Sequence, residues 1–139
     1  MSTGSAAAGQ TRSRNVISAF GLGVSDLERS VDFYSRVLGM VELRRVKVSY
    51  MDEVIIGFEG RPPLVLMHYT DGSVRNYKDN PVKLVIYVDD PVDLFERVKA
   101  EGLPVVREPG PSAEMDGAII ALIKDPDGYV LEFIQRQQR

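Results

Sequence analysis

Three ionisable residues stand inside otherwise apolar stretches of this sequence and are candidates for chemistry. His68 lies in PLVLMHYT, Lys83 in KLVIYV and Glu132 in YVLEFIQ. Histidine, lysine and glutamate side chains can transfer protons or hold a charged substrate, so an enzyme built on them would use general acid–base chemistry. The chain has no cysteine, which excludes a cysteine nucleophile, a thiolate metal site and a disulfide framework.

An internal repeat supplies the elements that must position these residues. Residues 19–39, AFGLGVSDLERSVDFYSRVLG, and residues 83–102, KLVIYVDDPVDLFERVKAEG, share the order of an apolar strand, an acidic turn, an amphipathic helix and a final glycine. Such self-similarity indicates a duplicated structural unit. Ser25, with a glutamate three residues on, is the expected N-cap of the first helix. Asp90 is the expected N-cap of the second, with Pro91 in its first turn.

Each predicted helix is followed by three short strand-like segments separated by turn residues. They span residues 41–50, 53–60 and 63–70 in the first half and residues 104–108, 117–124 and 129–135 in the second. The turn DPDG at 125–128 should join the last two strands as a hairpin, with Gly128 at positive φ. The sequence therefore predicts an α+β fold of two βαβββ units, residues 14–70 and 82–136, joined by a polar linker at 70–81.

Length and composition narrow the class of protein further. At 139 residues, with 44% hydrophobic and 27% charged residues, the chain fits one globular domain over residues 14–139. A formal net charge of −3 and the lack of a dense Lys/Arg cluster argue against a nucleic-acid partner. Residues 1–13 mix small and polar types and are expected to form a disordered leader. No apolar run has the length of a membrane span, so we expect a soluble, cytoplasmic protein with no membrane partner.

Three motifs give the sequence a specific resemblance to a known superfamily. GLGVSDLERSVDFYSRVLGM near the start, VDD before the second helix and KDPDGYVLEFIQ at the end resemble the hallmarks of the vicinal-oxygen-chelate superfamily, over residues 15–136. The resemblance implies the glyoxalase and bleomycin-resistance fold, a curled mixed sheet around a small-molecule cavity. Members include metal-dependent glyoxalase I, methylmalonyl-CoA epimerase, extradiol dioxygenases, fosfomycin-modifying enzymes and metal-free proteins that sequester bleomycin. The fold alone therefore does not decide the chemistry.

The resemblance also implies four positions for a metal site, on the first and last strand of each unit. Alignment of the two copies places them at Ala19, Leu66, Lys83 and Glu132. Zinc, nickel or iron needs about three or four nitrogen or oxygen ligands, and only Glu132 offers one. The ammonium of Lys83 would repel a divalent cation. We therefore predict that the family's zinc, nickel or iron is absent and that no other cofactor replaces it.

The same alignment places Lys83, Glu132 and His68 on strand faces that should line the cavity, because strand side chains alternate. Lys83 would occupy the place of the metal charge and pair with Glu132, and these two residues with His68 form the candidate catalytic group. A purely structural ion pair is an equally open interpretation. The small and apolar residues nearby favour a hydrophobic ligand with one polar or anionic group. The expected ligand-binding residues are Ala19, Gly21, Leu66 and Tyr87.

Three functions remain open at this point, and one of them is not catalytic. The first is a metal-independent lyase or isomerase in which Glu132 is the base and Lys83 stabilises an oxyanion. The second is a binding protein that sequesters a small molecule, as in the bleomycin-resistance branch. The third is a metal-dependent lactoylglutathione lyase or dioxygenase, to which Asp52, Glu53 and Glu59 could add carboxylates. A homodimer is expected in each case because exposed sheet edges must be covered.

Overall fold

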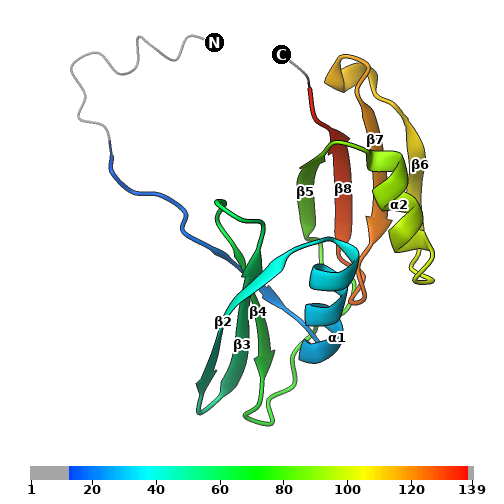
Figure 1. The fold of residues 1–139 in the computed structure, drawn as a ribbon. Coiled ribbons are helices and arrows are strands. Elements are labelled where there is room, and N and C mark those ends of the chain that lie inside the picture. Colours follow the sequence, from blue (N-terminus) through cyan, green and yellow to red (C-terminus); the bar gives the residue numbers. More distant parts are fainter. Residues whose placement is uncertain (1–12, 138–139) are drawn as a thin grey trace.

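The computed structural model describes residues 13–137. The leader predicted for residues 1–13 thus lies outside the described residues, apart from Ser13. Two βαβββ units follow one another along the chain, as predicted, and Figure 1 shows their sheets in separate parts of the molecule. No helix within residues 13–137 is long and apolar enough to cross a membrane.

The first unit contains a four-stranded sheet in the order β1-β4-β3-β2. β1 runs parallel to β4, and the other neighbouring strands are antiparallel. Helix α1 continues directly into a π-helical segment, η2, which the sequence pattern did not predict. The elements are β1 (Phe20–Gly23), α1 (Leu27–Asp32), η2 (Phe33–Val37), β2 (Val41–Val48), β3 (Met51–Gly57) and β4 (Leu64–Tyr69).

The second unit repeats this topology, with the strand order β5-β8-β7-β6 and a parallel pair formed by β5 and β8. The turn between β7 and β8 has Gly128 at a φ of +88°, which confirms the predicted hairpin. The elements are β5 (Lys83–Val88), α2 (Pro91–Lys99), β6 (Val105–Pro111), the short 3-10 helix η3 (Ala113–Met115), β7 (Ile119–Lys124) and β8 (Val130–Gln135).

The two helix N-termini differ in how well the sequence predicted them. Asp90 caps α2, accepting a hydrogen bond from the backbone N–H of Asp93 at 3.0 Å, with Pro91 at the first position. The N-cap of α1 is Asp26, which accepts from the backbone N–H of Arg29 at 3.1 Å, so the prediction of Ser25 was wrong. Both residue types cap helices well. Here the hydroxyl of Ser25 is engaged elsewhere, in a bond to a distant part of the chain.

The core lies between each sheet and its helix. Leu22 and Val24 of the first strand segment are 2% and 0% exposed, as the predicted alternation requires. Phe20, which shares their parity, is 49% exposed because it lies at the start of an edge strand. The buried side chains of both units form one continuous cluster. Its fully buried members include Tyr34, Val54, Ile56, Leu66, Phe95, Val98, Ala121, Ile123, Leu131 and Phe133.

Neither α1 nor α2 covers the opposite face of its sheet. The sheets share no strand pair, and Figure 1 shows that they do not close around a common space in the single chain. Helices α1 and α2 pack on one side of their own sheets. The side of each sheet away from its helix is called the open face below.

Candidate functional site

The predicted ion pair forms on the open face of the second sheet. Nζ of Lys83, the first residue of β5, lies 2.8 Å from Oε1 of Glu132 in β8. The parallel register, which sets Val85 opposite Glu132, brings these side chains together from adjacent strands. The Lys83 side chain is 53% exposed and that of Glu132 is 8% exposed. The pair therefore presents an ammonium group to solvent above a buried carboxylate.

Apolar side chains surround this pair. Along β5 the residues Lys83, Val85 and Tyr87 alternate with half-buried ones and point to the open face. Val85 is 52% and Tyr87 is 63% exposed, which is unusual for large apolar side chains in a sheet. Tyr87 thus lies on the same face as the ion pair, as predicted. An apolar surface with one charged pair suits a ligand with an apolar body and a polar end.

The first sheet has an open face with little side-chain bulk on β1. A Cβ atom on Gly21 would lie 3.1 Å from the Sδ atom of Met67, so Gly21 faces Met67 on the side away from α1. Glu53 pairs with Met67 across β3 and β4 and is half-buried. Neighbouring residues in register share a face, which places the carboxylate of Glu53 on this open face. The sequence offered Glu53 only as one of three spare carboxylates.

Leu66 does not lie on this open face, and the prediction that it does was wrong. It is fully buried beneath α1 and pairs with Leu22. Because Ala19 aligns with Lys83, Gly21 aligns with Val85 two residues further on. In the second sheet Val85 is opposite Glu132, and in the first sheet Gly21 is opposite Val65. Val65 is therefore the counterpart of Glu132. The alignment was one residue out, and a shift of one residue moves a strand side chain to the other face.

His68 is also separated from the ion pair, in contrast to the predicted catalytic group. It lies on β4 of the first sheet, where its Nδ1 is 2.9 Å from the carbonyl oxygen of Val24. Its ring stacks against Tyr77, with ring centroids 5.7 Å apart. These contacts tie the end of β4 to the linker. The structure therefore gives His68 a packing position and does not bring it to Lys83 and Glu132.

The side chains at the four aligned positions do not fit a transition metal. With Val65 in place of Leu66, the set is Ala19, Val65, Lys83 and Glu132, and one carboxylate is its only anionic ligand. Within residues 13–137 no cluster of three His, Asp or Glu side chains could hold a metal ion. Zinc sites use about four donors and catalytic ones about three from protein. This donor set within one chain is too small for such a site.

A buried carboxylate network joins the two units near the N-terminus of α1. Asp127, in the turn between β7 and β8, accepts hydrogen bonds from the backbone N–H and the hydroxyl of Ser25 and from the guanidinium of Arg29 at 3.1 Å. Asp125 accepts from the hydroxyl of Tyr34 at 2.6 Å. Burial raises the pKa of the Asp125 carboxyl and raises the pKa of Tyr34 well above its usual range. This network explains why Ser25 does not cap α1.

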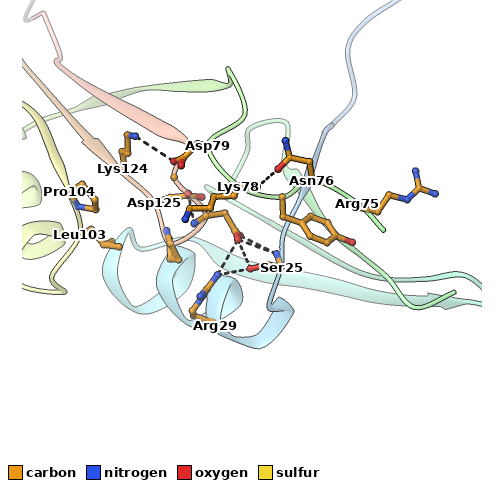
Figure 2. A pocket seen from close by; sticks show the side chains of 14 residues that line it. Ser25, Arg29, Arg75, Asn76, Lys78, Asp79, Leu103, Pro104, Lys124 and Asp125 are labelled. Carbon is orange, nitrogen blue, oxygen red and sulfur yellow. Dashed lines mark hydrogen bonds and ion pairs between the residues drawn. The ribbon is translucent and has the colours of Figure 1, made fainter. Parts of the chain in front are cut away.

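An open groove of about 680 Å³ lies beside this network, and we call it the junction groove. Figure 2 shows its lining side chains, with the ion pair of Lys124 and Asp79 on one side and the bonds between Ser25 and Arg29 on the other. No sequence motif predicted this groove, because its walls come from four separate segments. They are the start of α1, the linker between the units, the loop after α2 and the turn between β7 and β8.

Comparison with known proteins agrees with this fold. The sequence model of the Glyoxalase/Bleomycin resistance protein/Dioxygenase superfamily matches residues 16–133 of this chain. The chain therefore belongs to this superfamily, as the sequence motifs indicated. It is a glyoxalase-like member, because proteins named lactoylglutathione lyase are among its relatives.

The chain is 38% identical over 126 residues to a lactoylglutathione lyase of Neisseria meningitidis, covering 84% of this chain and 87% of the relative. It is 32% identical over 123 residues to a lactoylglutathione lyase of Escherichia coli, covering 84% of this chain and 89% of the relative. Among solved structures, a glyoxalase I variant from Zea mays superposes with a TM-score of 0.74 at 30% identity, over 87% of this chain. This chain spans only 44% of that maize protein. The trypanothione-dependent glyoxalase I of Leishmania major gives a TM-score of 0.72 at 25% identity, covering 87% of this chain and 86% of that one.

Proposed function

We propose that this protein binds a small organic molecule with a carbonyl or carboxylate oxygen on the open face of the second sheet. It acts there as a lyase or isomerase without a divalent metal. The observation that carries the proposal is the ion pair of Lys83 and Glu132, with its exposed ammonium, its buried carboxylate and its apolar surroundings. A hydrophobic or aromatic body would pack on Val85 and Tyr87. A carbonyl oxygen would bind the ammonium of Lys83.

The two charged groups supply the two halves of a proton transfer. When a carbonyl oxygen replaces Glu132 as the partner of the ammonium, the carboxylate of Glu132 becomes free to accept a proton. It takes that proton from the carbon next to the carbonyl: the C–H bond breaks, an O–H bond forms on Glu132, and the electron pair moves to the carbonyl oxygen. Lys83 stabilises the resulting oxyanion. Where the carbon that loses its proton carries a hydroxyl group, the proton of that hydroxyl moves to the oxyanion and the proton on Glu132 returns to the former carbonyl carbon. The carbonyl and hydroxyl groups have then exchanged places, which is an isomerisation.

A homodimer would complete this site. Both open faces carry exposed apolar side chains, including Leu43 at 59% and Val41 at 53% on the first sheet, and exposed apolar patches often mark interfaces. We propose that the first sheet of one copy covers the second sheet of another. Gly21 and Glu53 would then lie opposite Lys83 and Glu132. Sedimentation velocity at two protein concentrations tests this, and a monomer at both would contradict it.

The relatives favour a second candidate, a metal-dependent lactoylglutathione lyase. Two bacterial proteins of that name are 38% and 32% identical to this chain over most of its length. Such an activity would require further metal ligands from a second copy, for which Glu53 is the available carboxylate. The ammonium of Lys83 beside Glu132 opposes this candidate, because it would repel the cation.

Metal analysis combined with turnover assays separates these candidates. Purified protein is analysed for zinc, nickel and iron, and the interconversion of lactoylglutathione with glutathione and methylglyoxal is measured with and without each ion. The proposal expects substoichiometric metal and no ion-dependent rate. Stoichiometric metal with an ion-dependent rate would establish the second candidate and refute the first.

A screen of aromatic and aliphatic carbonyl compounds then tests the site itself. Ligand-induced shifts in Tm identify binders, and NMR spectra in deuterated water detect exchange of the hydrogen next to the carbonyl. Lys83→Met and Glu132→Gln should abolish this exchange. The matched controls are Lys47→Met and Asp52→Asn, which break a 2.9 Å ion pair on the first sheet and should leave exchange intact. Binding without exchange in the unaltered protein would instead leave a sequestering function.

A further inference from the structure

The junction groove is separate from the open faces of both sheets. None of Lys83, Glu132, Val85 or Tyr87 lines it. It lies where the linker crosses between the two units, and Figure 2 shows side chains from both units around it. Its volume of about 680 Å³ is within the range of small-molecule sites.

Basic side chains dominate the accessible charge of the groove. The guanidinium of Arg29 is 46% exposed although it contacts Asp127 at 3.1 Å, and Asp127 itself is only 3% exposed. Lys124 is 32% exposed and only loosely paired, with its Nζ 3.5 Å from Asp79. Lys78 makes no ion pair with any side chain in residues 13–137. With Arg75, whose guanidinium stacks 3.8 Å from the centroid of the Tyr69 ring, four cationic side chains line the groove. The one lining carboxylate that remains well exposed is that of Asp79.

This positive charge is not a consequence of overall composition, since the chain has a formal net charge of −3. The carboxylate of Asp127 is hydrogen-bonded to Ser25 and ion-paired with Arg29, and Asp125 is only 1% exposed. Neither carboxylate is therefore free to neutralise the charge of Lys78 or Lys124. Lys78 and Lys124 thus retain unused N–H donors, which favour an anion.

The rest of the lining is apolar. Leu103 and Pro104 come from the loop after α2, Pro126 comes from the turn between β7 and β8, and the ring of Tyr77 comes from the linker. An inorganic ion alone would leave these surfaces exposed to water. A molecule with an apolar body would cover them and gain hydrophobic free energy in proportion to the area buried.

We propose that the junction groove binds a small organic anion, an oxyanion such as a phosphate or carboxylate on an aromatic or aliphatic body. Lys78, Lys124 and Arg29 hold the charge, and the leucine, proline and tyrosine side chains pack against the body. The site is independent of the chemistry at Lys83 and Glu132. Because its walls come from both units, an occupant stabilises the junction between them, and binding raises Tm by linkage.

Titration of the ¹⁵N-labelled full-length chain with phenyl phosphate tests this site. Inorganic phosphate and phenol are titrated in parallel, as the charge and the body alone. Phenyl phosphate should shift the backbone amides of Asn76, Lys78 and Gly128 and should bind more tightly than either part. Higher ionic strength should weaken it, since the attraction is between exposed charges.

Two variants with a matched control make the test specific. Lys78→Gln and Lys124→Gln should each weaken phenyl phosphate by about threefold to fivefold, the size of one exposed ion pair. Lys47→Gln, which makes the same change of charge at an 80% exposed lysine on the first sheet, should leave the affinity unchanged. Shifts confined to the amides around Val85 and Glu132, the lack of any saturable shift, or equal weakening in all three variants would each overturn the proposal.

Discussion

Substitution of Gly128 by alanine should damage the junction between the two units. Gly128 has a φ of +88°, where an alanine costs about 1 kcal/mol more than a glycine. Its added Cβ would also overlap Oδ1 of Asp79 and lie 3.0 Å from the Cγ atom and 3.2 Å from the backbone nitrogen. Rotation of the Asp79 side chain cannot relieve the contact with the backbone.

The linker must therefore move away from the turn. This shift of a few tenths of an ångström weakens the hydrogen bond from the backbone N–H of Asp79 to the carbonyl oxygen of Asp127, which is 3.0 Å long. Rotation of the Asp79 carboxylate away from the new Cβ also gives up its 3.5 Å contact with Nζ of Lys124. One such bond contributes about 1 kcal/mol. The expected loss in the free energy of unfolding for Gly128→Ala is about 2 kcal/mol, of which about 1 kcal/mol is backbone strain.

A second glycine of nearly equal backbone conformation isolates the two contributions. Gly39 has a φ of +85°, and a Cβ there would meet nothing within 4 Å. Gly39→Ala should cost only the strain, about 1 kcal/mol. Urea unfolding followed by far-UV circular dichroism measures both variants at the same pH. Equal losses for the two would refute the reasoning, because the linker would then have yielded without cost.

Three further variants test the buried and half-buried charges. Tyr34→Phe leaves one oxygen of the Asp125 carboxylate without its hydroxyl donor and should lower the free energy of unfolding by about 2 kcal/mol; a loss below the measurement error would contradict this. Because burial raises the pKa of Asp125, the folded protein holds that proton to a higher pH than the unfolded chain, so the wild type loses stability as pH rises above about 4. Asp125→Asn has no such loss, so the difference in the free energy of unfolding between the wild type and this variant should shrink as pH rises. A difference that grows with pH would contradict the prediction. Lys83→Met should cost about 1 kcal/mol by leaving Glu132 unpaired, and adding Glu132→Leu should recover most of it; additive losses in the double variant would show that the pair is not coupled.

Local patterns carried most of the fold. The duplicated order of strand, helix and glycine stop, the cap of α2 at Asp90 and the turn at Gly128 depend on residues close in sequence, and the structure has each of them. The pairing of Lys83 with Glu132 was also predictable. Glu132 interrupts an apolar strand and Lys83 begins one, and the first and last strands of a βαβββ unit lie side by side. A segment with one hydrophobic periodicity and with capping or turn residues at its ends has few alternative secondary structures.

The sequence by itself determined most of the strands and helices, with η2 as an exception, and which residues alternate along each strand. Tertiary structure alone decided the register between strands, which buried Leu66, left Val65 as the counterpart of Glu132 and kept His68 away from the site. It also decided that Ser25 bonds to Asp127, 102 positions away. Alternation gives two equivalent choices of face, and only the packing of a whole sheet against its helix selects one of them. The junction groove is the extreme case, since no short stretch of the chain contains enough of its walls to reveal it.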